Sequence, residues 1–112
     1  MSAITTHVLD TSRGCPAAGI PVILEREAAG VWELIGSGIT NTDGRITDLL
    51  PGESIETGVY RLLFNTGRYF ATQNAQTFYP EVIVIFNIEH SDQHYHVPLL
   101  LSPFGYSTYR GS

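Results

Sequence analysis

Alternation of apolar and polar residues with a period of two runs along most of this 112-residue chain. Residues 4–9 are typical, because Ile4, Thr6 and Val8 fall on one face of an extended segment while Thr5, His7 and Leu9 fall on the other. A period of two is that of a β-strand with one face buried, and the helical period of 3.6 is nearly absent. The sequence therefore predicts a fold built almost entirely of strands.

Turn signals divide the chain into short segments. Ala28-Ala29-Gly30 allows residues 20–27 and 31–39 to form a hairpin. Asp43-Gly44 tolerates the positive φ angles of a tight turn, and Pro51-Gly52 breaks the chain again. We expect strands over residues 4–9, 20–27, 31–39, 58–64, 81–88, 93–101 and 106–109.

One short helix is expected after residues 58–64, with Asn65 or Thr66 as its N-cap and Ala71 near its end. The β-branched run over residues 81–88 predicts a strand covered on both faces, and residues 93–101 are its expected hairpin partner. Seven or eight short strands with one short helix predict an all-β fold, an antiparallel β-sandwich, in a single domain over residues 1–112.

The charge composition excludes several classes of partner. Only 17 residues are charged, the net charge is −5, and all six cationic residues are scattered arginines. Nucleic-acid binding needs a clustered basic face, so it is not expected. The longest apolar stretches are far shorter than the roughly 20 residues that cross a bilayer. So low a charge content favours a self-associating protein.

The chain as given has no secretory signal, and its single cysteine, Cys15, cannot form an internal disulfide. Both features lead us to expect a cytoplasmic protein.

Four histidines could carry chemistry: His7, His90, His94 and His96. His94 and His96 share one strand face, where they could offer two imidazoles to zinc with His7 or His90 as a third ligand. No cysteine or carboxylate stands at a matching spacing, so we expect no metal. Nor is there a glycine-rich phosphate loop, which argues against a nucleotide cofactor.

The C-terminal segment, residues 106–112, is aromatic and hydroxyl-rich and contains Arg110. It could close the sandwich as an edge strand. It could equally bring a guanidinium and hydroxyls into a pocket.

Four segments resemble the transthyretin-related family, the 5-hydroxyisourate hydrolases. They are Thr5-Thr6-His7-Val8-Leu9-Asp10 with Gly14 and Pro16, Thr40-Asn41-Thr42-Asp43-Gly44-Arg45, His94-Tyr95-His96-Val97-Pro98-Leu99-Leu100, and Tyr109-Arg110-Gly111-Ser112. They occur in the family's order and cover essentially the whole chain.

This resemblance implies a transthyretin-like sandwich of two four-stranded sheets, assembled as a homotetramer, a dimer of dimers, with sites in a channel between dimers. It implies hydrolysis of 5-hydroxyisourate to 2-oxo-4-hydroxy-4-carboxy-5-ureidoimidazoline in urate catabolism, a small-molecule reaction without a cofactor. The implied catalytic residues are His7, Arg45 and His96, and the implied substrate-binding residues are His7, Arg45, Tyr109 and Ser112.

The chemistry of these side chains suits the implied reaction. Opening a cyclic ureide is acyl transfer to water, so it needs a base, an acid and stabilisation of an oxyanion. His7 and His96 can serve as base and acid, although the sequence does not assign which is which. Arg45 stays protonated and can hold an anionic substrate or a carbonyl oxygen.

Two questions stay open at the level of sequence. Arg110 either contacts the substrate or anchors the tail by pairing with a carboxylate. The alternative function is that of a transthyretin-type carrier, which binds an aromatic ligand in the same channel. The resemblance implies that carriers lack the catalytic histidines and the terminal motif, and both are present here.

Overall fold

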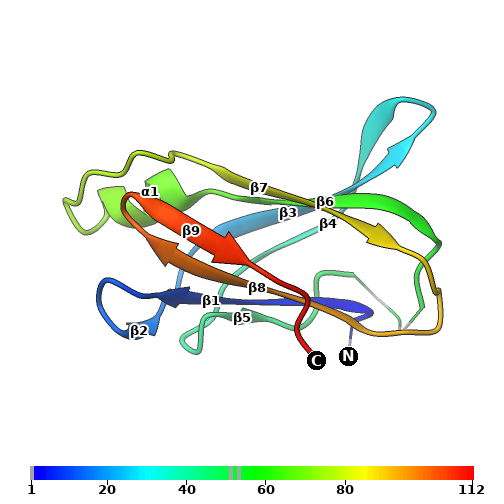
Figure 1. The fold of residues 1–112 in the computed structure, drawn as a ribbon, viewed down its shortest axis with the longest axis horizontal. Helices are drawn as coiled ribbons and strands as arrows, with labels where there is room; N and C mark the ends of the chain where they lie inside the picture. The colour runs from blue at the N-terminus through cyan, green and yellow to red at the C-terminus, as the bar shows by residue number, and fades with distance from the viewer. Residues whose placement is uncertain (1, 51, 53) are drawn as a thin grey trace.

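A computed structural model describes residues 2–50, 52 and 54–112 and shows two β-sheets packed face to face (Figure 1). The first sheet has the order β2-β1-β8-β9, with β5 also paired to β1, and the second has the order β4-β3-β6-β7. The first sheet comprises β1 (Ile4–Asp10), β2 (Cys15–Pro16), β5 (Arg45–Ile46), β8 (Tyr95–Ser102) and β9 (Gly105–Thr108). The second comprises β3 (Pro21–Ala28), β4 (Val31–Ile39), β6 (Gly58–Phe64) and β7 (Val82–Ile88).

This architecture confirms the predicted all-β sandwich, and the seven expected strands lie within one or two residues of their predicted bounds. The two-residue strands β2 and β5 were not predicted, and with β5 the first sheet has five strands rather than the four that the resemblance implied. Every strand pair is antiparallel except β1 with β8, which run parallel. The predicted hairpin is β3–β4, whose turn contains Ala29 at φ 52° and Gly30 at φ 79°.

The short helix α1 (Thr66–Ala71) also lies where the sequence predicted it. The Asn65 side chain accepts a hydrogen bond from the Arg68 backbone N–H at 3.1 Å and so caps the first turn. A helix this short is held mainly by packing. Phe70 is buried, and the Tyr69 hydroxyl donates to the Asp10 carboxylate at the end of β1, which ties α1 to the first sheet.

The predicted hairpin between residues 81–88 and 93–101 was wrong. β7 pairs with β6 in the second sheet, whereas β8 pairs with β1 and β9 in the first. The chain between β7 and β8 therefore crosses from one sheet to the other (Figure 1). Alternation decides which face of a strand is buried, but it does not decide which strand lies beside it.

The prediction that residues 81–88 are covered on both faces was also wrong for the single chain. β7 is an edge strand whose side chains alternate between buried and exposed, and Ile85 is 60% exposed. Its apolar outer face therefore has no covering layer within the described chain.

The hydrophobic core lies between the two sheets and draws on both. Val8 and Leu99 from the first sheet and Leu24 and Leu62 from the second are fully buried. Burying a side chain of this size stabilises the fold by roughly 1.5–3 kcal/mol. The inward faces of β1 and β8 are thus committed to packing, and their outward faces are free to carry polar side chains. In the part of the chain that the structure describes, no helix is long and apolar enough to cross a membrane.

Candidate active site

Three of the predicted catalytic residues lie on neighbouring strands of the first sheet. His7 on β1 is paired with Arg45 on β5, and Thr5 on β1 is paired with His96 on β8. Side chains of directly paired residues project to the same side of a sheet. Since Ile4, Thr6 and Val8 of β1 face the core, these four side chains share the outer face.

A tight turn holds Arg45 beside His7. The Asn41 side chain accepts hydrogen bonds from the backbone N–H groups of Asp43 at 2.9 Å and Arg45 at 3.0 Å. Gly44 follows with φ 74°, and a Cβ atom there would lie 2.4 Å from the Val8 carbonyl oxygen. Any other residue at this position would be strained and would clash with β1. The Asp43-Gly44 pair is thus the local reason that Arg45 enters the sheet next to His7.

A hollow of about 180 Å³ opens on this face. It is lined by Thr5, Thr6, Arg45, Thr47, His94, His96 and Ser112. The fold therefore gathers Arg45, His96 and Ser112, which come from three separate parts of the sequence, around one hollow. His7 lies beside it on β1 but is not among the residues that line it.

His96 is held through both its side chain and its backbone. Its Nδ1 lies 2.8 Å from the Thr5 hydroxyl oxygen, and its backbone carbonyl accepts a hydrogen bond from the Gly111 N–H at 2.8 Å. Burial lowers the pKa of His96 below its usual value of 6.5, and electrostatic interactions with Arg45, His7 and His94 lower it further. His96 is therefore neutral at neutral pH and can accept a proton.

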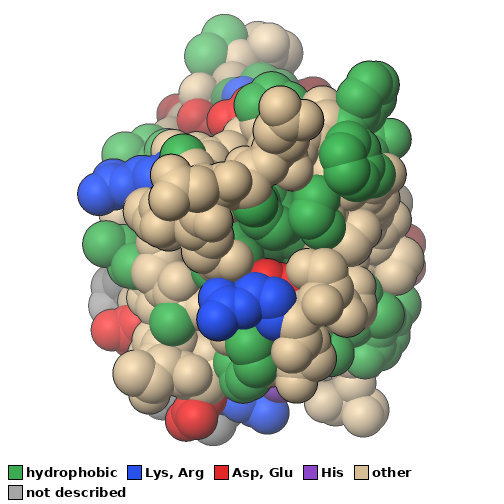
Figure 2. All heavy atoms as spheres, turned by 90° about the vertical axis from the view of Figure 1, so that its left-hand side faces the viewer, with side chains coloured by type: hydrophobic (Ala, Val, Ile, Leu, Met, Phe, Trp, Pro, Cys, Tyr) green, Lys and Arg blue, Asp and Glu red, His purple; other side chains and the backbone are tan. Residues whose placement is uncertain are grey.

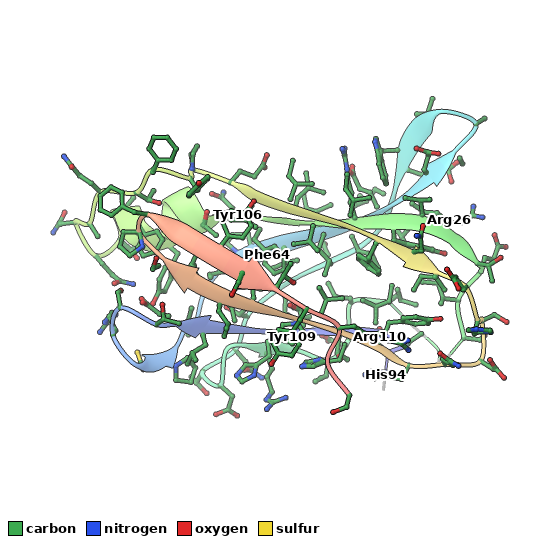
Figure 3. All side chains as sticks on the ribbon, in the orientation of Figure 1. Arg26, Phe64, His94, Tyr106, Tyr109 and Arg110 are labelled. Carbon is green, nitrogen blue, oxygen red and sulfur yellow. The ribbon has the colours of Figure 1, made fainter. Side chains whose placement is uncertain are left out.

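Within the described residues, Arg110 contacts an aromatic ring and neutral oxygen acceptors rather than the carboxylate that the sequence offered as its anchor. Its guanidinium carbon lies 4.4 Å from the centre of the Tyr95 ring. One guanidinium nitrogen donates to the Gln93 side chain at 3.1 Å and to the His94 carbonyl at 3.4 Å. Figure 3 shows Arg110 and His94 close beside each other. Stacking and hydrogen bonding of this kind anchor the C-terminal segment against β8.

Tyr109 does not lie at the same hollow as His96 within one chain. It is 57% exposed and borders a separate cavity of about 280 Å³ between β7 and the β8–β9 pair. Arg110 and apolar side chains of β7 border the same cavity. The predicted contact between Tyr109 and a substrate thus has no counterpart within the single chain.

Thr5 and His94 were not predicted as site residues, yet both line the hollow and contact each other. Alternation along β1 already put Thr5 on the same face as His7, so that signal was available. Nothing in the sequence showed that β1 and β8 are neighbours, which is what brings Thr5 to the two histidines. As for metals, residues 2–50, 52 and 54–112 contain no group of three or more His, Cys, Asp or Glu side chains able to hold an ion.

Known proteins resemble this chain over nearly its whole length. A curated 5-hydroxyisourate hydrolase of Salmonella dublin is 47% identical over 109 residues, which cover 97% of this chain and 80% of that protein. The solved structure of the Klebsiella pneumoniae 5-hydroxyisourate hydrolase is 37% identical with a TM-score of 0.86, covering 97% of this chain and 92% of that one.

Sea bream transthyretin in complex with thyroxine is also similar, at 32% identity and a TM-score of 0.91, over 97% of this chain and 94% of that one. A model of the HIUase/Transthyretin family matches residues 4–111. The chain therefore belongs to the HIUase/Transthyretin family.

Proposed function

We propose that this chain, as one domain over residues 1–112, hydrolyses 5-hydroxyisourate to 2-oxo-4-hydroxy-4-carboxy-5-ureidoimidazoline in urate catabolism. The observation that carries the proposal is the convergence of Arg45, His96 and Ser112 on one hollow beside His7. The similarity to curated 5-hydroxyisourate hydrolases over almost the whole chain supports the same conclusion.

The groups around the hollow supply what ring opening requires. A water oxygen bonds to the ring carbonyl carbon while a histidine nitrogen takes the water proton. The Arg45 guanidinium stabilises the negative charge that develops on the carbonyl oxygen. The ring C–N bond then breaks, and a histidine returns a proton to the leaving nitrogen. Neutral His96 is suited to the first proton transfer, His7 is available for the second, and Ser112 offers a hydroxyl to the polar edge of the substrate.

The lining of the hollow favours this reaction over a carrier function. Hydroxyl, imidazole and guanidinium groups surround it, whereas an aromatic carrier ligand is held mainly by apolar side chains. The likeness to a thyroxine-binding transthyretin lies in the fold, and the histidines and arginine beside the hollow serve hydrolysis.

The proposed enzyme assembles as a homotetramer, a dimer of dimers. Support comes from apolar groups that the single chain leaves at its surface: Phe78 and Phe104 are each 70% exposed, and Ile85 on edge strand β7 is 60% exposed. Hydrophobic side chains are visible at the end of the sandwich that carries α1 and the β8–β9 turn (Figure 2). Exposed apolar groups next to unpaired strand edges favour association between chains. Sedimentation velocity tests this proposal, because a mass of one chain at micromolar concentration would contradict it.

The proposed location is the cytoplasm. Cys15 is a free thiol in the described chain, which suits a reducing compartment. Fractionation of cells producing the tagged chain tests this, and recovery outside the cytoplasmic fraction would contradict it.

The test of the proposed reaction uses substrate made in place. Urate oxidase converts urate to 5-hydroxyisourate, whose decay is followed by ultraviolet absorbance with and without the protein. We expect decay well above the spontaneous rate. An unchanged rate, together with tight uptake of thyroxine, would instead favour the carrier.

A further inference from the structure

One threonine hydroxyl contacts two imidazole rings at the proposed site. Thr5 Oγ1 lies 3.0 Å from His94 Nε2 and 2.8 Å from His96 Nδ1. Thr5 is only 4% exposed, so its hydroxyl is held between the two rings rather than in bulk water. Neither Thr5 nor His94 was predicted as a site residue, and any part they play in catalysis rests on the proposed function.

Because Thr5 has only one hydroxyl proton, the tautomers of His94 and His96 depend on each other. A threonine hydroxyl has a single proton to donate, while its oxygen accepts hydrogen bonds. If the Thr5 proton points at His94 Nε2, His96 must supply its own Nδ1–H to complete the second bond. If the proton points at His96 Nδ1, the imidazole proton of neutral His96 moves to Nε2. The direction of one hydroxyl thus decides whether Nε2 carries a lone pair or a proton.

The surroundings of His96 favour the first arrangement. Thr5 holds Nδ1, so Nε2 is the ring nitrogen that remains for a substrate. Arg45 borders the same hollow, and its positive charge acts on His96, which favours a lone pair over an N–H on the ring nitrogen that Thr5 does not hold. A lone pair on Nε2 is also what a general base for water needs.

We propose that Thr5 is a positioning residue that links His94 to His96 and holds His96 in the Nδ1–H tautomer, with Nε2 as the base. His96 Nδ1–H donates to Thr5 Oγ1, and the Thr5 hydroxyl donates to His94 Nε2. When Nε2 takes the proton of the attacking water, the Nδ1–H to Thr5 bond stays in place and orients the imidazolium. His94 is the last acceptor in this series of hydrogen bonds and does not contact the reacting atoms.

The direct test is nitrogen-15 NMR of the histidine rings in the full-length protein at neutral pH. Long-range proton–nitrogen spectra distinguish a protonated ring nitrogen from an unprotonated one. We expect His96 with its proton on Nδ1 and none on Nε2. A proton on Nε2 of His96 in the wild-type protein would overturn the proposal by itself. This readout needs no turnover, so it separates failure of the tautomer assignment from failure of the proposed function.

Variants of Thr5 give the kinetic test. Thr5→Val keeps the β-branched shape but removes the hydroxyl. We expect kcat to fall about tenfold or more with KM within about twofold, because positioned proton transfer contributes roughly 10²–10⁴-fold and a misoriented base loses part of that contribution. Thr5→Ser keeps the hydroxyl and is expected to restore most of kcat and the Nδ1–H tautomer.

Thr11→Val is the matched control. It also removes a threonine hydroxyl, but one in the turn just after β1, where it donates to the Leu101 carbonyl, so we expect wild-type kinetics. Thr5 has no positioning role if Thr5→Val retains both the wild-type kcat and the Nδ1–H tautomer. The same conclusion follows if Thr5→Ser folds but its kcat is as low as that of Thr5→Val.

Discussion

Gly111 lies directly against the imidazole ring of His96. A Cβ atom at position 111 would lie 2.6 Å from His96 Cδ2 and 3.2 Å from Pro98 Cγ. The Gly111 N–H also donates to the His96 carbonyl at 2.8 Å, so the backbone at position 111 cannot move away without losing this bond. The position of the His96 ring therefore depends on the absence of a side chain at residue 111.

Gly111→Ala is expected to displace the His96 ring and to lower kcat for 5-hydroxyisourate by about a hundredfold, because a shift of about 1 Å in a reacting group costs that much. Turnover measured by ultraviolet decay checks this. Gly105→Ala is the matched control, because a Cβ atom there meets nothing closer than 3.7 Å, and it should retain wild-type turnover. Equal rates for the two variants would show that the ring does not rely on Gly111.

The pH dependence of kcat/KM is expected to report the lowered pKa of His96. Burial and electrostatic interactions with Arg45, His7 and His94 lower the pKa of this ring, so it remains neutral at pH values somewhat below 6.5. A base works only when unprotonated, so the rate should stay on its plateau as the pH falls through 6.5 and decline only at a lower pH. Arg45→Gln removes the positive charge of the guanidinium, so the pKa of His96 should rise. The acid limb of the remaining activity should therefore move to higher pH. A wild-type limb above 6.5 would contradict this account of His96.

Asp10 is expected to stabilise the fold through its ionised form. Burial opposes its ionisation, but hydrogen bonds from Ser12, Tyr69 and Arg13 more than offset this and lower its pKa below 3.8. A carboxyl with a lowered pKa contributes stability that is present above pH 3.8 and is lost as the pH falls through the lowered value. Asp10→Asn should lower the free energy of unfolding by about 1–3 kcal/mol at pH 7.

Urea unfolding at a fixed protein concentration measures this change. Tyr69→Phe removes only one of the donors to Asp10 and should cost less, about 1 kcal/mol. If Asp10→Asn is as stable as the wild type at pH 7, the carboxylate contributes nothing to the fold.

The exposed end of the sandwich is expected to mediate assembly. Phe78 and Phe104 are each 70% exposed, so replacing both with aspartate buries no charge within one chain. It would place two charges in any interface formed there, at a cost of several kcal/mol. We expect Phe78→Asp with Phe104→Asp to reduce the sedimenting mass from four chains to fewer. Val31→Asp, at a side chain 62% exposed in the β3–β4 hairpin, should remain tetrameric. If the double variant and Val31→Asp sediment with the same mass, the interfaces between chains do not involve Phe78 and Phe104.

The sequence predicts where the strands lie better than it predicts which strands pair with each other. Period-two alternation located β1, β3, β4 and β6, because burial of one face imposes that pattern locally, and a run of β-branched residues located β7. It misassigned the partner of β8, because hydrogen bonding between strands is satisfied equally by β7 or by β1. The exposed face of Ile83 and Ile85 was missed for a similar reason: a run of β-branched residues signals burial without saying whether the cover comes from the same chain.

The same holds for the site: motifs identify some of its residues, but the contacts between them depend on how the strands pair. Resemblance of motifs pointed to Arg45, His96 and Ser112, and the fold gathers them around one hollow. The anchoring of Arg110 depends on the Tyr95 ring on β8, so composition could not choose between its two roles. The contact of Thr5 with His94 and His96 requires the parallel β1–β8 register, which no local pattern contains.

The most direct measurement for the proposed site is the turnover of 5-hydroxyisourate by three alanine variants and one control. His7→Ala, Arg45→Ala and His96→Ala should each lower turnover by at least about a hundredfold, since each removes proton transfer or charge stabilisation. His90→Ala removes an exposed histidine that does not line the hollow, and it should turn over at the wild-type rate. Wild-type rates in the first three variants, or an equal loss in His90→Ala, would contradict the assignment of hydrolysis to this face of the sheet.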